Sequence, residues 1–360
     1  MERAPGRART PNAVAENRAK LTARSGRVSR VTSQTGPDRA APAWLPGFLA
    51  LAVIWGTSFL FIKVGVRELH PLWLTFGRVA TGALVLVAIM LVTRDRLPRD
   101  PRVWAHLVVV AALGVSAPFT LFGFGEQRVS SVLAGIWNAA TPLVALPLAA
   151  LLFRTERLTR ALAAGIAVGF LGVLVVLGVW RDVGGSELTG QLMCFGAAMC
   201  YAVAIPYQKK FIAGRPGSGV SFAAAQLLMA LAQLAVIAPL VAGAPPAPWR
   251  LSGAVVGCVL ALGALGTGIA FVLNFRVIRI AGASTSASVT YLMPVVATLV
   301  GVLILGERLR WNQPAGAVVV LVGVALSQGL VARLRAARVP AAPAPADQVM
   351  TARGARSPAE

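Results

Sequence analysis

Long apolar runs recur through the middle of this chain, and only short charged segments separate them. A helix that crosses a bilayer needs about 20 mostly apolar residues. The runs approach that length ten times, so the sequence predicts an all-α integral membrane protein with ten transmembrane helices. The expected spans are 46–66, 72–93, 105–125, 131–153, 161–180, 189–209, 220–242, 253–275, 284–305 and 313–332.

Composition agrees with a lipid bilayer as the solvent of this chain. Of its 360 residues, 57% are hydrophobic and 13% are charged, whereas soluble domains carry about 25% charged residues. The net charge of +21 would suit a nucleic-acid partner if one face of a folded domain gathered it. Lys and Arg lie instead in the tails and in short loops between apolar runs, which argues against nucleic acid.

The distribution of basic residues predicts the orientation. With the N-terminus inside, 26 of the 34 Lys and Arg residues fall on the inner side and six on the outer side, while Lys63 and Arg78 lie within spans. Cytoplasmic loops carry the excess of Lys and Arg. We therefore expect a multi-pass protein of a bacterial plasma (inner) membrane with both termini in the cytoplasm.

The sequence repeats itself. The segment 141–158 reads TPLVALPLAALLFRTERL, and 293–309 reads MPVVATLVGVLILGERL, with one residue fewer between its proline and its glutamate. Glycines follow both glutamates at the same two distances, nine and sixteen residues on, at Gly165, Gly172, Gly316 and Gly323.

Each repeat holds five helices, so the two halves are inverted across the membrane. Inverted repeats are the recurring build of secondary transporters, whose substrate site lies near the midplane between them. The expected organisation is a disordered basic cytoplasmic tail at 1–43, repeats at 44–182 and 183–333, and a second disordered cytoplasmic tail at 334–360.

The chain resembles the EamA-type transporters of the drug/metabolite transporter superfamily over about residues 46–332. The resemblance rests on AVIWGTSFLFIKVGV at 52–66, on the helix of Arg78, and on FRTERL at 153–158 paired with LGERL at 305–309. It implies two five-helix repeats that move amino acids, metabolites, sugars or drugs, often outward. FRTERL departs from the family pattern because it lacks the usual glycine and carries an extra residue.

Polar and aromatic side chains inside the spans are the candidates for substrate contact, because an unpartnered polar group is costly in hydrocarbon. Interhelical hydrogen bonds or ordinary core packing explain such residues about as well. The substrate-binding candidates are Trp55, Asn138, Tyr201, Tyr207, Gln226, Asn274 and Tyr291, of which Gln226 aligns with Arg78 between the repeats.

Three charged residues are candidates for a gating or charge role. For Lys63 and Arg78, snorkelling to the outer surface is the favoured interpretation. Glu126 precedes Arg128 at the end of a span, so a solvated interfacial carboxylate is favoured over a proton relay. Pro142 and Pro294 are expected to kink their helices.

The sequence therefore predicts a secondary transporter for a small metabolite or an amino acid-like solute, working outward by alternating access. Drug efflux and sugar or metabolite uptake stay open as alternatives. A membrane-embedded enzyme is disfavoured, since only two His residues are present and no Walker segment is found. A helical scaffold is disfavoured because it would not need an inverted repeat. No cofactor or metal is expected. The expected partners are the substrate and the lipid bilayer, and a homodimer stays open.

Overall fold

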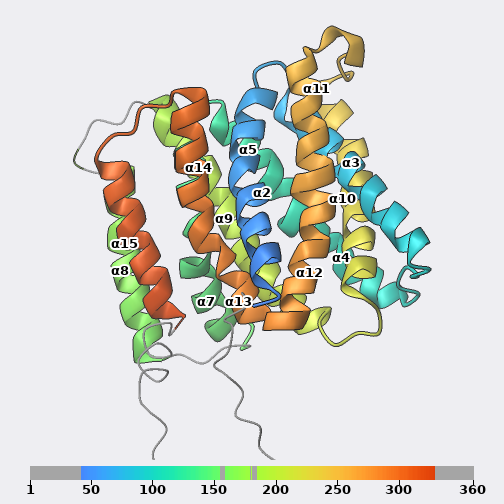
Figure 1. Ribbon diagram of the computed structural model, residues 1–360, viewed down its shortest axis with the longest axis horizontal. Helices are drawn as coiled ribbons and strands as arrows, with labels where there is room; N and C mark the ends of the chain where they lie inside the picture. Colours follow the sequence, from blue (N-terminus) through green and yellow to red (C-terminus); the bar gives the residue numbers. More distant parts are fainter. Residues whose placement is uncertain (1–41, 155–158, 179, 181–184, 329–360) are drawn as a thin grey trace, which may run out of the picture. The chain divides into compact units, whose positions relative to one another are not determined.

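Helices form all the regular structure in the part of the chain that the computed structural model describes, which is residues 42–154, 159–178, 180 and 185–328 (Figure 1). Residues 1–41 of the first predicted tail, the whole second tail, and Glu156 of the first repeat motif lie outside these residues.

The first half holds five apolar segments, two of them divided into shorter pieces. These are α2 (Leu45–Gly65), α3 (Pro71–Val92), α4 (Pro101–Ala111) continuing through the π-helical η1 (Ala112–Ser116) into α5 (Ala117–Glu126), α6 (Ser131–Ala139) with α7 (Thr141–Leu151), and α8 (Arg160–Leu177).

The second half repeats this order. It holds α9 (Gly185–Phe211), α10 (Gly219–Ala242), the short η2 (Pro248–Arg250), α11 (Gly253–Leu260) continuing through the π-helical η3 (Ala261–Ile269) into α12 (Ala270–Ala281), α13 (Ala283–Ala287), α14 (Val289–Leu305) and α15 (Asn312–Ser327).

The prediction of ten spans is confirmed within the described residues. Nine helical segments are long and apolar enough to cross a membrane, and α15 is a shorter apolar helix. The third segment of each half is interrupted at a corresponding place by a π-helix, in ALGVS and in ALGALGTGI. Such interruptions are rare in helices and frequent at functional sites.

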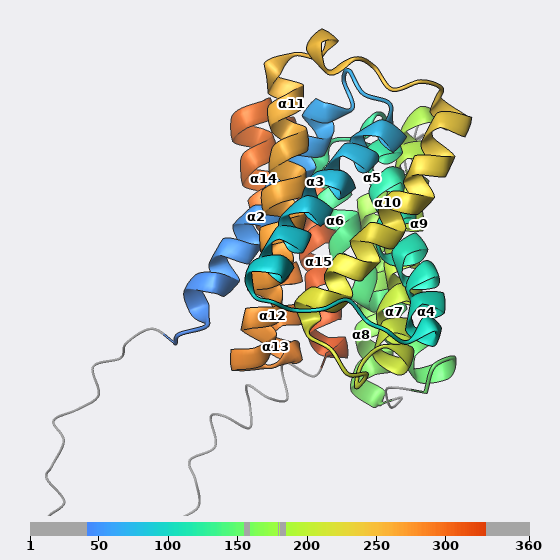
Figure 2. The same ribbon diagram turned by 90° about the vertical axis from the view of Figure 1, so that its right-hand side faces the viewer.

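Helices from the two halves pack against each other through the bundle. In Figure 1, α2 lies between α14 and α12, and it contacts both. Figure 2 shows α3 and α10 on the side that faces the viewer. The helix α3 packs on α10 and η3, and α9 packs on α5 and α7. The fold is therefore that of ten helices arranged as two inverted five-helix repeats, and the space between the repeats is the centre of the bundle.

The repeated glycines hold the last helices of the two halves together. The helices α8 and α15 pack side by side at one edge of the bundle (Figure 1). A methyl group added at Gly316 would lie 2.9 Å from the carbonyl oxygen of Gly172, and one added at Gly323 would lie 2.7 Å from that of Gly165. Only small residues let two backbones approach this closely.

The departure of FRTERL from the family pattern has a local backbone explanation. Gly306 ends α14 in the left-handed conformation, with φ 66°. In the first repeat, Arg154 takes that conformation with φ 55°, one residue earlier relative to the glutamate. In the first repeat, an arginine therefore takes the left-handed conformation that a glycine takes in the second.

The loops of the bundle lie at two opposite ends. The Arg67 end carries the loops 66–70, 127–130, 243–252 and 306–311. The His106 end carries the loops 93–100 and 212–218 and the turn at 282.

Candidate functional site

Arg78 joins the two halves of the molecule inside the bundle. It lies on α3 with 7% of its surface exposed. Its Nε donates a hydrogen bond of 3.0 Å to Oγ1 of Thr267 in η3, and its guanidinium lies 3.7 Å from the ring centre of Phe119 on α5. The prediction that Arg78 snorkels to the surface is therefore wrong, because a hydroxyl and an aromatic face from neighbouring helices hold the charge inside.

The two π-helical segments receive polar side chains from the opposite half. Nε1 of Trp55 on α2 donates to the carbonyl oxygen of Gly266 in η3 at 3.2 Å. Nε2 of Gln226 on α10 donates to the carbonyl oxygen of Val110, just before η1, at 3.3 Å. Arg78 and Gln226, aligned from the sequence, thus both extend from their own repeat to the interrupted helix of the other.

Glu126, the last residue of α5, is buried with 0% of its surface exposed. Neither of its carboxyl oxygens has a hydrogen-bond partner among the described residues. The preference for a solvated interfacial carboxylate is therefore wrong. The carboxyl group is enclosed because α5 packs against α9, α3, α2 and α6.

Lys63 does not extend directly to the outer surface, as the snorkelling interpretation expected. Its half-buried side chain crosses from α2 to the end of α5, where Nζ donates to the carbonyl oxygens of Glu126 at 2.5 Å and Val129 at 2.7 Å. These carbonyls lie at or beyond the C-terminus of α5, where a cation is favoured by the helix dipole. Lys63 therefore fixes the backbone that carries Glu126.

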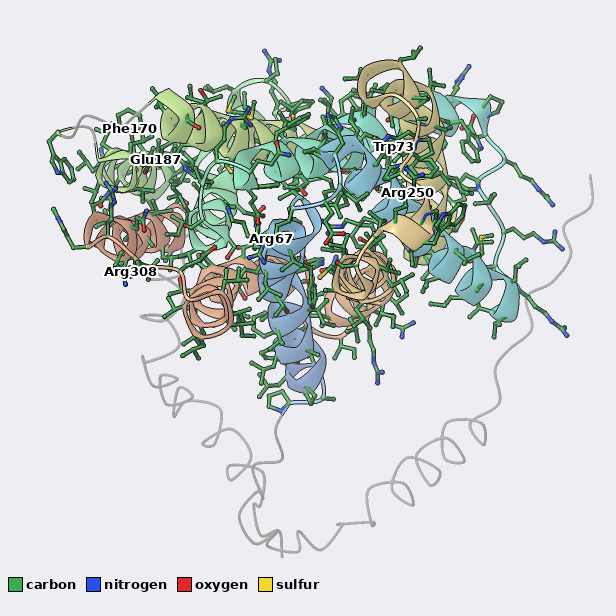
Figure 3. All side chains as sticks on the ribbon, turned by 90° about the horizontal axis from the view of Figure 1, so that it is seen from above. Arg67, Trp73, Phe170, Glu187, Arg250 and Arg308 are labelled. Carbon is green, nitrogen blue, oxygen red and sulfur yellow. The ribbon has the colours of Figure 1, made fainter. Side chains whose placement is uncertain are left out.

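A pocket of about 300 Å³ opens beside these two residues at the Arg67 end. Lys63, Val66, Arg67, Glu126 and Gln127 line it. Seen from this end in Figure 3, Arg67 lies at the tip of α2 in the middle of the bundle. The pocket therefore leads from the central part of the Arg67 end toward the buried Glu126.

Glu307, which belongs to the second half, contacts the start of α6 in the first half. Its carboxylate accepts hydrogen bonds from the backbone N–H of Ser131 at 2.8 Å, from the Ser131 hydroxyl at 3.0 Å and from the N–H of Val132 at 3.2 Å. These are the unpaired donors at the start of α6. Glu307 therefore caps the N-terminus of α6 from the opposite half.

Tyr201 and Asn138 lie toward the centre of the bundle. The ring of Tyr201 on α9 is 6.3 Å from that of Phe122, and Tyr201 interacts electrostatically with Arg78. Asn138, near the end of α6, directs Nδ2 to Sδ of Met293 on α14 at 3.9 Å. Sulfur is a weak acceptor, so this contact leaves most of the hydrogen-bonding capacity of the amide available.

The structure does not bring the other three candidates to this centre. Tyr207 accompanies His106 at the His106 end, with its hydroxyl 2.8 Å from Nδ1. Asn274 accepts a hydrogen bond of 2.5 Å from Ser286 beside α13. Tyr291 packs near Leu143 and Val320, on the side that faces α7 and α15.

Pro142 and Pro294 both lie in the fourth apolar segment of their half. Pro142 is the second residue of α7, directly after the break at Ala140, and Pro294 lies inside α14. The fourth segment of the first half is thus divided into two helices, and that of the second half bears a proline in its first turns.

Sequence reasoning missed Thr267, Trp73 and Trp137. The indole Nε1 atoms of both tryptophans are buried without a partner among the described residues, and Thr267 is the hydroxyl that holds Arg78. Thr267 carried a signal, because it is a polar residue in the middle of an apolar span. The two indoles could not be distinguished from core aromatics.

Loop contacts between the halves occur at both ends. At the His106 end, Arg215 and Asp100 form an ion pair of 3.2 Å. At the Arg67 end, the backbone N–H of Ser252 donates to Glu68 at 2.8 Å. Asp100 and Ser252 are the N-caps of α4 and α11, so corresponding positions of the inverted repeats carry the two contacts.

Within the described residues, no group of three or more His, Cys, Asp or Glu side chains is arranged to hold a metal ion. The polar groups of the centre are an arginine, a lysine, a carboxyl group, hydroxyls and indoles from both halves. Such a set, buried between inverted helical repeats, defines a polytopic membrane transporter.

The chain belongs to the EamA-like transporter family, whose model matches residues 43–178 and 188–328. It is 29% identical to a probable amino-acid metabolite efflux pump of Salmonella typhimurium, over 77% of this chain and 93% of that protein. It is 31% identical to a probable terminal-alkyne amino-acid exporter of Streptantibioticus cattleyicolor, over 72% of this chain and 84% of the relative. These are names of transporters and not of enzymes.

A solved crystal structure shares the fold. It covers 82% of this chain and 100% of its own, with a TM-score of 0.58 and 20% sequence identity.

Proposed function

We propose that this chain exports an amino acid or an amino-acid-like metabolite across the bacterial inner membrane by alternating access around Arg78. The observation that carries the proposal is the hydrogen bond from Arg78 in the first repeat to Thr267 in the second. It places a buried cation at the boundary between the two units that rock against each other in transporters of this build.

The charges at the centre suit a solute with a carboxylate. Arg78 uses Nε for Thr267, and no hydrogen bond from its terminal guanidinium nitrogens to the described residues is present. A guanidinium offers five donors in a fork that matches a carboxylate. We expect Trp55, Asn138 and Tyr201 to add apolar surface with a few polar groups, which would fit a small amphipathic metabolite.

The direction of transport rests on orientation and on the relatives. Because the Arg67 end carries fewer basic residues than the His106 end, we place it outside the cell. The pocket beside Lys63 then opens outward. The two relatives described above are named as an efflux pump and an exporter, which supports outward movement of amino-acid-like solutes.

The test compares metabolites in the medium of bacterial cells that express the wild type, Arg78→Met or Arg128→Met at equal membrane amounts. Arg128 is an exposed arginine at the Arg67 end, so its variant controls for loss of one positive charge. We expect one or more amino-acid-like compounds to accumulate outside with the wild type and with Arg128→Met, and at least tenfold less with Arg78→Met.

Depletion of such compounds from the medium would instead indicate uptake. Accumulation of added cationic dyes without any amino-acid-like compound would indicate drug efflux. Equal export by Arg78→Met and the wild type would reject the site.

A further inference from the structure

The carboxyl group of Glu126 is enclosed without any hydrogen-bond donor. Its surface is 0% exposed, and both oxygens are unpartnered among the described residues. An ionised carboxylate in such a place lacks both water and a partner. Burial costs a neutral carboxylic acid far less free energy than it costs the ionised form. The geometry therefore suits the protonated form of Glu126.

Cations lie nearby, but none donates a hydrogen bond to this carboxyl group. Lys63 from α2 and Arg78 from α3 both interact electrostatically with Glu126, as does Glu307 beyond α14. Nζ of Lys63 is occupied by two backbone carbonyls, and Nε of Arg78 by Thr267. From α9, the thiol of Cys194 faces the same group, and α6 contributes no titratable side chain.

The arrangement of these charged groups around Glu126 can change when the helices move. A shift of α2 or α3 relative to α5 that frees Lys63 or Arg78 from its present acceptor gives Glu126 a counter-ion, and the ionised form then becomes the favoured one. The two charge states of Glu126 thus suit two arrangements of the helices. A group of this kind links proton binding to conformation.

The pocket at the Arg67 end supplies the route for protons. Glu126 forms part of its wall, together with Lys63 and Arg67, although the carboxyl oxygens themselves are covered. A substrate cannot touch a covered carboxyl group in this arrangement. Protonation from this pocket therefore requires a rotation of the side chain or an intervening water molecule.

We propose that Glu126 is a proton-binding site that couples transport to the proton gradient, which makes this chain a proton antiporter. In the arrangement described here, Glu126 takes up one proton from the Arg67 side and becomes a neutral acid. After the repeats rearrange, it releases that proton to the His106 side and pairs with Lys63 or Arg78. The inference rests on the proposed transport function and adds its energy source.

The first experiment measures the proton without any substrate. The wild type, Glu126→Gln and Glu187→Gln are reconstituted in lipid at neutral pH, and the infrared absorption of protonated carboxylic acids is recorded. Glu187 is a partly exposed carboxylate in the first turn of α9. We expect an acid band in the wild type and in Glu187→Gln, and its loss in Glu126→Gln. A spectrum without this band in the wild type, or with it in Glu126→Gln, overturns the proposal.

The second experiment measures coupling in proteoliposomes, with an equimolar mixture of the twenty protein amino acids as the probe. For one proton exchanged per neutral solute, an imposed pH gradient drives accumulation up to about tenfold per pH unit. We expect such accumulation with the wild type and Glu187→Gln, and none with Glu126→Gln. Glu126→Asp keeps a titratable carboxyl group and should therefore retain part of the accumulation.

The outcomes separate this inference from the proposed function. If the wild type moves no amino acid but shows the acid band, the proposed substrate fails while the proton site stands. Amino-acid movement that ignores the pH gradient, with no acid band, overturns the proton site and leaves the proposed function standing.

Discussion

Nε of Arg78 and Oγ1 of Thr267 lie 3.0 Å apart, and this hydrogen bond connects residues that are 189 positions apart in the sequence. The hydroxyl of Thr267 in turn donates to the carbonyl oxygen of Leu262 at 3.0 Å, inside the π-helical segment η3. The buried cation of the first repeat is therefore tied to the irregular helix of the second. A movement of one repeat against the other must alter this contact.

Arg78→Lys tests whether the shape of the guanidinium matters beyond its charge. Lysine keeps the charge but cannot stack on Phe119 while it donates to Thr267. Hydrogen bonds of charged groups contribute about 1.5–3 kcal/mol, so we expect the initial rate of export to fall about tenfold or more. Thr267→Val, which removes the acceptor, should give a loss of similar size. Export by Arg78→Lys at the wild-type rate would contradict the assignment.

Glu307→Ala tests the bracing of α6. The change leaves two backbone N–H groups at the start of the helix without their acceptor. We expect a loss of stability of about 1–3 kcal/mol, measured as a lower thermal midpoint in detergent. Glu187→Ala removes a partly exposed carboxylate from the first turn of α9 and should change the midpoint little. Equal midpoints for the two variants would show that the capping bonds contribute nothing.

Gly323→Ala tests the close contact between α8 and α15. The added methyl group would lie 2.7 Å from the carbonyl oxygen of Gly165, so the two backbones must separate. We expect a loss of about 1–3 kcal/mol in thermal stability. Gly257→Ala is the control, because a methyl group there meets no atom within 4 Å. A normal midpoint for Gly323→Ala would mean that this helix pair is loosely packed in the membrane protein.

Arg154→Gly and Gly306→Ala form a reciprocal pair at the left-handed turns of the two repeats. A non-glycine residue in this conformation costs about 1–2 kcal/mol. Arg154→Gly should therefore raise the thermal midpoint, and Gly306→Ala should lower it, although nothing lies within 4 Å of the new methyl group. Changes of the same sign in both variants would contradict the conformational explanation.

The pH dependence of one loop contact follows from Glu68. The hydroxyl and the backbone N–H of Ser252 hold the pKa of Glu68 below its ordinary value of 4.5. Because the folded-state pKa is depressed, the contact stabilises the protein fully above pH 4.5 and is lost as the pH falls through the folded-state value. The thermal midpoints of wild type and Glu68→Gln should differ at neutral pH and converge in acid. A difference that is constant with pH would contradict this linkage.

Much of the fold follows from local features of the sequence. The apolar runs predicted the spans to within a few residues for most of the bundle, because each run must satisfy its own backbone hydrogen bonds in lipid. Helix starts carry the expected side chains, as at Asp100, Ser130 and Ser252. The repeated glycines at Gly165, Gly172, Gly316 and Gly323 indicated an internal duplication, and the structure places them opposite each other.

The environment of the charged residues was decided only by the tertiary structure. From the sequence, Glu126 at the end of an apolar run and two residues before Arg128 is typical of an interface. Four neighbouring helices bury it, and their contacts depend on packing between distant segments. In the same way, the acceptor of Arg78 comes from the opposite repeat. The sequence determines which segments enter the membrane because hydropathy is a local property, whereas burial and hydrogen bonding depend on which helices meet.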